Sequence, residues 1–541
     1  MRAEYAPVRI PGVEPRARRP VSSTGWAAAA PHAVVIGAGF GGMAAALRLR
    51  AKGYRVTLID RCRQLGGRAQ VFERDGFRHD AGPTVITAPF LFDELFALFG
   101  ERFADHVELV PLTPWYRFCF ADGDHFDYGG TLDETLAEIG RISANDSASD
   151  SANDSADDRA GYLRLLEHSR RIFEIGFTQL SDKPFDRLRT MLRVIPSLIR
   201  LRCDRTVWGL VKTFLKNDKL RQAFSIQPLL VGGNPFDTTS IYGLIHYLER
   251  AYGVFFAMGG TGAITSALAS LMERRGVAVQ LGRTVERIRI EGGVATAVEL
   301  ADGSVLAADL VVSNADAAHL YTSMIPRARQ AWSSRLKLAA ASYSMGLFVL
   351  YFGTRKAYPD VAHHTIWLGE RYRELLDEIF NKKVLSEDFS LYVHRPTATD
   401  PSFAPAGCES FYVLCPVPNL QADIDWAVEA PRLRDRIVAA LGRTILPGLA
   451  ETITAEFSMT PRDFKHDYLS VNGAGFSVAP LFRQSAWFRF HNRAEGIRNL
   501  YLVGAGTHPG AGLPGVLCSA KVVDALVPVA EMVVRQQGHV A

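Results

Sequence analysis

Two glycine-rich segments at opposite ends of the chain have the residue types of a phosphate-binding turn. The first, GAGFGG at residues 37–42, follows an apolar run and precedes a segment rich in Ala and Leu. It therefore matches GxGxxG between a strand and a helix. In such a turn Gly37 allows the tight bend, Gly39 lets the backbone approach a pyrophosphate, and Gly42 lets helix and strand pack closely. The pattern predicts a dinucleotide site at a helix N-terminus.

The residues after this turn favour FAD over NAD. The run YRVTLID predicts a second strand that ends at Asp60, about eighteen residues after Gly42. This is close to the spacing of about 20 at which an acid binds the ribose hydroxyls of adenosine. Next, in RCRQLGGRAQVF, the doublet Gly66 and Gly67 lets the backbone come close to a cofactor, and Arg68 can neutralise phosphate charge. NAD enzymes have no general need for this element, which many flavoproteins carry as R-x-x-G-G-R.

The second glycine-rich segment, GAGTHPGAGLPG, predicts the matching half of the FAD site. It follows the strand NLYLVG, which ends at Gly504, and it precedes a helix that begins near Gly515. Gly506 lies within the same turn. We expect the N-terminus of this helix to face the flavin ring and to stabilise negative charge on the reduced flavin. The two glycine segments would then bind the two ends of one FAD.

The order of the remaining elements predicts an α/β chain of interleaved domains. With 541 residues and 48% apolar composition, the chain is too long for one hydrophobic core. Strand-rich and helix-rich pieces alternate. We expect a Rossmann-like FAD-binding domain assembled from discontinuous segments and a mixed α+β substrate domain. The FAD-binding segments are residues 32–105, 225–320 and 476–541, and the substrate domain combines a helical part at 106–224 with a sheet at 321–475.

Two segments lie outside these domains by composition. Residues 1–31 are rich in Arg, Pro and Ala and lack the apolar core of a secretory signal, so we expect a disordered extension. Residues 143–158 repeat SANDSA and contain no apolar side chain larger than Ala. Such a segment predicts a solvated loop.

Composition and spacing exclude several other classes of protein. The formal charge of +4 is small, and no nucleic-acid-binding motif is present, so no nucleic-acid partner is expected. Six cysteines without CxxC spacing are typical of reduced thiols in a cytosolic protein. His363 and His364 would point to opposite faces of a strand, which favours packing or surface roles over a metal site. No apolar run reaches the length of about 18 residues that a membrane-spanning helix needs.

Four longer motifs resemble one known family. They are NLYLVGAGTHPGAGLPGVLCSAK, QSAWFRFHNR, DAGPTVIT and LLVGGNPFDTTSIYGLIH. Together they resemble the bacterial-type phytoene desaturases of the carotenoid/retinoid oxidoreductase family, and the likeness extends from about residue 33 to 530. The resemblance implies an FAD flavoprotein with the monoamine-oxidase-like two-domain plan. It also implies a cytoplasmic protein bound peripherally to the inner face of the cell membrane. By analogy, the Val285 backbone would contact adenine.

The resemblance also implies an activity. An FAD-dependent phytoene desaturase converts 15-cis-phytoene, an apolar C40 polyene, to lycopene by successive dehydrogenations, and it passes electrons to a quinone or to oxygen. Three alternatives stay open. In the first, the enzyme stops at neurosporene or acts on another carotenoid as a desaturase or isomerase. In the second, the protein is a soluble amine oxidase of the same fold, which would need a polar or aromatic cage for its amine substrate. In the third, it is a catalytically silent flavin or lipid carrier.

The family's catalytic pair is only partly matched. Its carboxylate, with an arginine three residues later, falls here on Thr190 and Arg193, so the acid is missing. Asp186 lies one helical turn before Thr190 and is our candidate substitute. The same residues could equally form a solvated helix face. The surrounding segment, residues 187–219, combines Arg and Lys with large apolar side chains. We expect it to bind an anionic membrane surface, and the alternative is a helical cap that packs on the core with its arginines reaching water.

Overall fold

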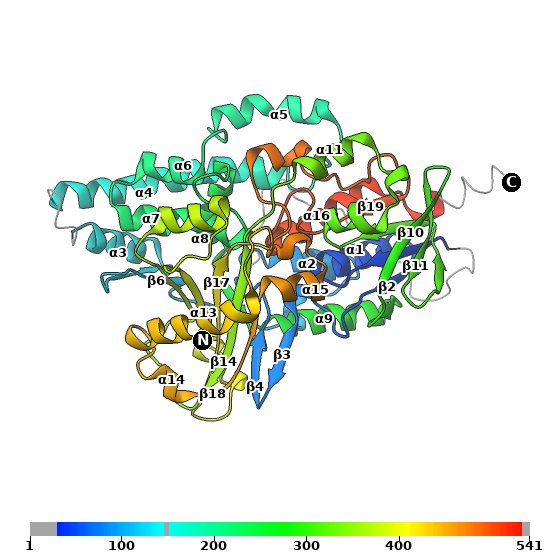
Figure 1. Cartoon of the computed structure of the whole chain (residues 1–541). Helices are drawn as coiled ribbons and strands as arrows, with labels where there is room; N and C mark the ends of the chain where they lie inside the picture. The colour runs from blue at the N-terminus through cyan, green and yellow to red at the C-terminus, as the bar shows by residue number, and fades with distance from the viewer. Residues whose placement is uncertain (1–29, 145–150, 533–541) are drawn as a thin grey trace.

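The computed structural model describes residues 30–144 and 151–532. Of the predicted N-terminal extension, residues 1–29 lie outside this range, as do residues 145–150 of the SANDSA segment and residues 533–541. Figure 1 shows the blue, green and red parts of the chain gathered in one half of the molecule, and the yellow strands and cyan helices in the other.

A five-stranded parallel sheet forms the first half. Its order is β19-β13-β1-β2-β9, so strands from the two ends of the sequence, β1 and β19, lie in one sheet with β13 between them. Because each strand pairs in parallel with the next, the carboxyl ends of β1, β2, β13 and β19 share one edge. The strands are β1 (His32–Ile36), β2 (Arg55–Ile59), β9 (Ala278–Gln280), β13 (Leu310–Ser313) and β19 (Leu500–Leu502). The prediction of a Rossmann-like domain built from discontinuous segments is confirmed.

Helices cover this sheet. α1 is buried along almost its whole length because it contacts β1, β2, α9 and α16 at once. Such a helix must be apolar all round, which explains its run of Ala and Leu. The covering helices are α1 (Phe40–Ala51), α2 (Phe90–Ala97), α9 (Gly260–Arg274) and α16 (Leu513–Leu526). A three-stranded antiparallel sheet, β10 (Val285–Glu291), β11 (Val294–Leu300) and β12 (Val305–Ala307), lies beside them.

One described stretch, Leu513–Met532, is long and apolar enough by length and composition to cross a membrane. It contains α16, whose Leu517, Cys518 and Val523 are buried in the core that α1 shares. Asp524 also forms an ion pair with Lys52, which follows α1, over 3.2 Å. The stretch therefore packs as a core helix of the FAD-binding half.

A seven-stranded sheet with the order β18-β14-β17-β16-β15-β6-β7 forms the second half. Every residue of β14 is buried, because Phe348, Leu350 and Phe352 pack under α13 while Leu347 and Val349 face an internal cavity. The strands are β6 (Tyr116–Cys119), β7 (His125–Tyr128), β14 (Gly346–Thr354), β15 (His364–Trp367), β16 (Leu391–His394), β17 (Glu409–Val417) and β18 (Ile453–Met459).

Helices from the middle of the chain, some of which line this cavity, complete the second half. They are α3 (Leu132–Ala144), α4 (Ser151–Phe173), α5 (Leu188–Arg200), α6 (Val207–Phe214), α7 (Asp218–Ser225) and α8 (Leu244–Tyr252). In Figure 1, α5 lies at the top of the molecule, above α6 and α4. Further helices, α11 (Trp332–Ala340), α12 (Tyr372–Asp377), α13 (Trp426–Arg443), α14 (Leu449–Thr452) and α15 (Pro461–Tyr468), lie in the later part of the chain.

The prediction of a solvated loop at residues 143–158 is wrong at its ends. Ser143 and Ala144 belong to α3, and α4 begins at Ser151. Asp158 is fully buried, and its carboxylate accepts hydrogen bonds from the Ser143 hydroxyl and the main-chain nitrogens of Lys216 and Asn217. Alanines and acids suit the first turns of a helix, and these donors satisfy the buried charge.

Candidate active site

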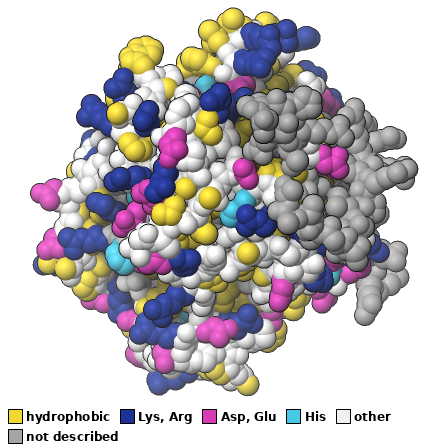
Figure 2. All heavy atoms as spheres, turned by 90° about the vertical axis from the view of Figure 1, so that its right-hand side faces the viewer, with side chains coloured by type: hydrophobic (Ala, Val, Ile, Leu, Met, Phe, Trp, Pro, Cys, Tyr) yellow, Lys and Arg dark blue, Asp and Glu magenta, His cyan; other side chains and the backbone are white. Residues whose placement is uncertain are grey.

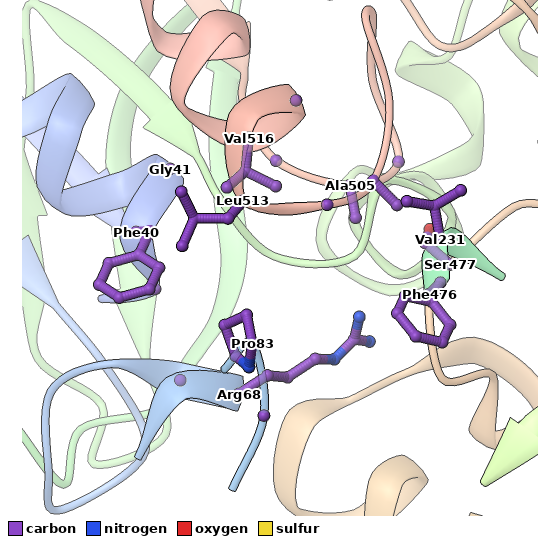
Figure 3. Close-up of a pocket in the computed structure, with 18 of the residues that line it drawn as sticks. Phe40, Gly41, Arg68, Pro83, Val231, Phe476, Ser477, Ala505, Leu513 and Val516 are labelled. Carbon is purple, nitrogen blue, oxygen red and sulfur yellow. The ribbon is translucent and has the colours of Figure 1, made fainter. Parts of the chain in front are cut away.

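A cavity of about 550 Å³ lies between the two halves and has two chemically different parts. The first part is at the carboxyl edge of the parallel sheet, where the glycine-rich turns follow β1 and β19. The second part is apolar and reaches between the seven-stranded sheet and the middle helices. Figure 3 shows Phe40 and Gly41 of α1, Leu513 and Val516 of α16, and Phe476 around the space into which Arg68 extends.

Most of the predicted FAD-binding residues line the first part of the cavity. They are Gly37, Gly39, Asp60, Gly66, Gly67, Arg68, Val285, Gly504, Gly506 and Gly515. Gly42 does not line it. A Cβ on Gly42 would overlap the carbonyl oxygen of Gly37, so this glycine allows the close packing expected of the third position. Lining the cavity is compatible with the predicted contacts to FAD, which stay predictions.

The two glycine turns meet at Asn314, which follows β13. A Cβ on Gly41 would lie 3.4 Å from the Cα of Gly504 and 2.8 Å from Nδ2 of Asn314. Asn314 donates from Nδ2 to the carbonyl oxygen of Val503 over 3.2 Å. The two glycine turns therefore lie against each other, with Asn314 as the side chain between them.

Asp60 braces the first glycine turn. Its carboxylate accepts hydrogen bonds from the main-chain nitrogens of Ala38 at 2.6 Å and Cys62 at 2.7 Å. Asp60 therefore connects the end of β2 to the turn after β1. This bracing was not predicted, and the predicted contact with ribose hydroxyls would use the remaining lone pairs of the same carboxylate.

Arg68 is a desolvated cation that faces the cavity. Its guanidinium donates to the Ser470 hydroxyl and to the carbonyl oxygen of Ala474, and within residues 30–144 and 151–532 no carboxylate forms an ion pair with it. Burial lowers the pKa of Arg68, although the field of Asp316 opposes this shift. A half-buried cation that no described carboxylate pairs with favours an anionic ligand group such as a pyrophosphate.

The motif QSAWFRFHNR supports the C-terminal glycine turn. Arg489 is buried, and its guanidinium donates to the carbonyl oxygens of Thr507 at 3.0 Å and Ala505 at 2.6 Å. Asn492 donates from Nδ2 to the carbonyl oxygen of His508 at 3.0 Å. These bonds shape the turn from which α16 begins at Leu513, so the helix N-terminus faces the cavity.

The second part of the cavity is lined mainly by apolar side chains. The contributing elements are α5, α8, β14, β17, a π-helical segment η3 (Glu174–Gln179) and a 3₁₀ segment η4 (Gln227–Val231). Lining side chains include Phe177, Leu198, Leu230, Ile245, Leu347 and Leu414. This wall offers few hydrogen-bond partners, so it suits a long apolar ligand.

Asp186 and Arg193 do not line the cavity. Arg193 is exposed and Asp186 is partly exposed. On α5, Val194 and Leu198 face the cavity instead, which leaves Arg193 on the opposite side of the helix. The catalytic role of this pair stays a prediction that their placement does not favour.

The carboxyl group in the apolar part of the cavity belongs to Glu249 of α8, which no sequence motif singled out.

The histidine prediction needs a correction. His363 and His364 are both buried, and their rings lie 4.6 Å apart instead of on opposite faces. The reason is that His363 precedes β15, so strand alternation does not apply to it. With His394 of β16 they form a group whose ligand atoms lie within 4.8 Å of one another. His364 Nδ1 is 2.7 Å from the hydroxyl of Tyr392, which lines the cavity.

Comparison with known proteins identifies the family. Residues 40–523 match the family model described as flavin containing amine oxidoreductase. The chain is 47% identical over 494 residues to the phytoene desaturase (lycopene-forming) of Paracoccus sp. (strain N81106 / MBIC 01143), covering 91% of this chain and 96% of that protein. It is 45% identical over 504 residues to the phytoene desaturase (neurosporene-forming) of Rhodobacter capsulatus, covering 92% and 94%.

Solved structures show the same fold. An oxidoreductase from Methanosarcina mazei matches with a TM-score of 0.60 at 17% identity, over 91% of this chain and 99% of that one. Cyclohexylamine oxidase from Brevibacterium oxydans IH-35A matches with a TM-score of 0.58 at 14% identity, over 93% and 99%. The fold and the cavity are those of an FAD-dependent oxidoreductase with the monoamine-oxidase-like plan. The chain belongs to the flavin-containing amine oxidoreductase family and, within it, to the bacterial phytoene desaturases.

The residues of the first part fit FAD, the cofactor of this family. Two helix N-termini, those of α1 and α16, face the same space, and the glycines leave it free of side chains. Arg68 supplies a positive charge that pairs with no carboxylate in the part of the chain that the structure describes. These features suit the pyrophosphate and the flavin ring of one dinucleotide.

Proposed function

We propose that this protein is an FAD-dependent phytoene desaturase that converts 15-cis-phytoene to lycopene by successive dehydrogenations. The observation that carries the proposal is the continuity of one cavity, in which the dinucleotide cradle opens directly into an apolar wall. A polyene held along that wall would lie with its chain against the flavin end of the cradle.

In this proposal the chain's residues mainly position the substrate and exclude water. When bound, FAD supplies an acceptor for a hydride. Leu198, Leu347 and Leu414 would hold the apolar chain in a fixed orientation, which is the principal protein contribution to such a reaction. The apolar wall would also keep water away from the reacting carbon atoms.

The lycopene product is proposed over neurosporene because relatives that form lycopene match at 47% identity, against 45% for a relative that forms neurosporene. To test the product, purified protein is incubated with FAD and phytoene-loaded liposomes without NAD, and the products are separated by chromatography with absorption spectra. Each dehydrogenation extends the conjugated system and shifts its absorption to the red. A lycopene spectrum supports the proposal, whereas accumulation of neurosporene changes the product and keeps the reaction class.

One observation favours amine oxidation as a second candidate. Tyr392 and Tyr412 line the cavity with ring centroids 5.7 Å apart, and Thr84 Oγ1 lies 2.8 and 2.9 Å from their hydroxyl oxygens. Paired aromatic rings can bind a cationic amine. Benzylamine in place of phytoene tests this alternative, because only an amine oxidase would reduce its flavin with it.

We also propose that the protein is cytoplasmic and binds the inner face of the cell membrane through α5. Leu188, Leu192 and Ile199 are exposed by 50%, 58% and 64%, next to the exposed Arg189 and Arg193. Figure 2 shows hydrophobic and basic side chains together at the top of the molecule, where α5 lies in Figure 1. Such a surface suits an anionic leaflet. Because Val194 and Leu198 of the same helix line the cavity, a polyene could enter there from lipid.

The electron acceptor in this proposal is a quinone or oxygen. Either would reoxidise the flavin between successive dehydrogenations. Measuring lycopene formation under argon, with and without an added quinone, distinguishes the two acceptors.

A further inference from the structure

Glu249 is the carboxyl group placed in the substrate part of the cavity. It lies on the face of α8 that also presents Leu244, Ile245 and Leu248 to the cavity, and it is 1% exposed. The other carboxyl groups that line the cavity belong to the FAD part, where Asp60 braces the first glycine turn, Asp316 caps a short helix, α10 (Ala317–His319), and Asp467 lies beside Cys62. Glu249 is therefore set among groups that would contact a polyene.

One oxygen of this carboxyl group has a protein partner and the other has none. Oε1 accepts a hydrogen bond of 2.8 Å from the hydroxyl of Tyr116 on β6. Oε2 is buried without a hydrogen-bond partner among the residues that the structure describes. Leaving a buried carboxyl oxygen unpaired is costly, and such exceptions call for a specific explanation.

Among residues 30–144 and 151–532, the neighbouring charged and titratable groups form no ion pair with this carboxyl group. Arg250, next in the chain, donates instead to the Gly130 carbonyl and the Thr135 hydroxyl and stacks on Trp115. Tyr116, Tyr128 and Tyr162 face Glu249 from β6, β7 and α4, and burial raises the pKa of each, so they stay neutral. His364, near Tyr116, is also neutral because burial lowers its pKa.

Burial raises the pKa of Glu249 to about 7, against the opposing effects of the Tyr116 hydrogen bond and Arg250. A carboxyl group with a pKa near neutrality is suited to proton transfer, because it accepts a proton readily and releases it again.

We propose that Glu249 is the catalytic base of the dehydrogenation and that Tyr116 positions it. This assignment rests on the proposed function. One carbon of the polyene loses a hydride to the flavin, which is thereby reduced. The adjacent carbon loses a proton to Oε2 of Glu249, and the electron pair of that broken C–H bond forms the new C=C bond. Glu249 then releases its proton before the next step.

The test follows flavin reduction by phytoene in the FAD-loaded protein, mixed without oxygen over a range of pH. Wild-type protein should reduce its flavin faster as the pH rises through about 7, because the ionised carboxylate is the base. Glu249→Gln keeps the size of the side chain and an oxygen for Tyr116. It should slow the reduction by about 100-fold or more and abolish its rise with pH, with bound FAD unchanged.

Two further variants complete the test. Tyr116→Phe removes a hydrogen bond that lowers the pKa of Glu249, so its pH profile should move to higher pH. Glu273→Gln, at an exposed position of α9, is the matched control and should behave as wild type. Reduction by Glu249→Gln at the wild-type rate would overturn the assignment while the proposed function stands. Failure of the wild-type protein to be reduced by phytoene would overturn the proposed function and the assignment with it.

Discussion

Asn314 donates a hydrogen bond from Nδ2 to the carbonyl oxygen of Val503 over 3.2 Å, and this bond connects the end of β13 to the C-terminal glycine turn at the FAD site. Val503 precedes the C-terminal glycine turn, and the amide of Asn314 also packs against Gly41 of the N-terminal turn. Neither turn is complete without the other, because the same side chain fills the space between them.

Gly504→Ala should therefore weaken FAD binding. Gly504 has φ of +107°, and a Cβ there would lie 2.5 Å from Nδ2 of Asn314. We expect at least about tenfold weaker binding, or about 1.4 kcal/mol, measured by titrating the apoprotein with FAD. Gly303→Ala is the control, because Gly303 has a similar φ of +81° but no atom within 4 Å of the added Cβ. Equal affinities for the two variants would contradict this role of the contact.

Arg68→Met should also weaken FAD binding, for an electrostatic reason. The substitution keeps much of the apolar stem but removes the cation that faces the cavity. Hydrogen bonds to charged groups contribute about 1.5–3 kcal/mol, so we expect about 10- to 100-fold weaker binding. The weakening should be smaller at high ionic strength. An unchanged affinity, measured with the same titration, would show that Arg68 does not contact the phosphates.

The FAD-binding half could be predicted from the sequence because its signals are local. A few neighbouring residues are enough to predict the strand, glycine turn and helix around Gly37 and the strand that ends at Asp60. Asn314 and Arg489 could not be found in this way. Asn314 contacts glycines far away in the chain, and only the pairing of β13 with β1 and β19 brings them together. Arg489 binds the carbonyl oxygens of Ala505 and Thr507, which no local pattern pairs with it. The asparagine in LVVSNAD was a usable signal, since it follows a strand of the same sheet.

The stability of the protein should fall as the pH falls below about 6.5, the ordinary pKa of histidine. Burial lowers the pKa of His79, His246 and His508 to about 4. Between these values the unfolded chain binds more protons than the folded protein, so acid favours unfolding. Each histidine should contribute about 1.4 kcal/mol per pH unit.

Denaturant unfolding at several pH values between 7 and 5 measures this slope. His246→Gln, a change in the core outside the cavity, should reduce the slope by about one histidine's share, or about 1.4 kcal/mol per pH unit, whatever its effect on stability at pH 7. A variant with the full wild-type slope would mean that His246 is not neutral in the folded protein.

The substrate half was harder to predict because its wall comes from short pieces of many elements. Val194 and Leu198 face the cavity, whereas Arg193, which precedes Val194, is exposed. The helical pattern of residues 187–219 alone does not say which side of α5 is covered. Glu249 lies three residues after the motif LLVGGNPFDTTSIYGLIH, and an acid inside an apolar helix gives no local sign of burial. The sequence therefore predicts the acting acid near Thr190, at Asp186, instead of at Glu249.

Leu198→Trp should block the polyene without affecting the cofactor. Leu198 is buried and lines the apolar part of the cavity, so a larger side chain would overfill it. Overfilling costs about 1–3 kcal/mol, and we expect at least about tenfold slower conversion of phytoene, measured with protein matched for bound FAD. Leu192→Trp, at an exposed position of the same helix, is the control. Full activity of Leu198→Trp would place the polyene elsewhere.

Leu192→Glu combined with Ile199→Glu should weaken binding to liposomes that contain anionic lipid. Both side chains are more than half exposed on α5, and burying each in lipid contributes about 1.5–3 kcal/mol. Co-sedimentation should show a loss of about tenfold or more, with FAD still bound. Val305→Glu, at an exposed apolar position of β12 in the other half, should bind as wild type. Undiminished binding by the double variant would exclude α5 as the membrane surface.

The most direct measurement of the central claim is flavin absorbance after FAD-loaded protein is mixed with phytoene in the absence of oxygen. Our account predicts that phytoene bleaches the flavin and that benzylamine does not, since the cradle opens into an apolar wall. After an acceptor is admitted, the carotenoid spectrum should move stepwise to the red. Bleaching by benzylamine, with phytoene inert, would contradict the account and identify the protein as an amine oxidase.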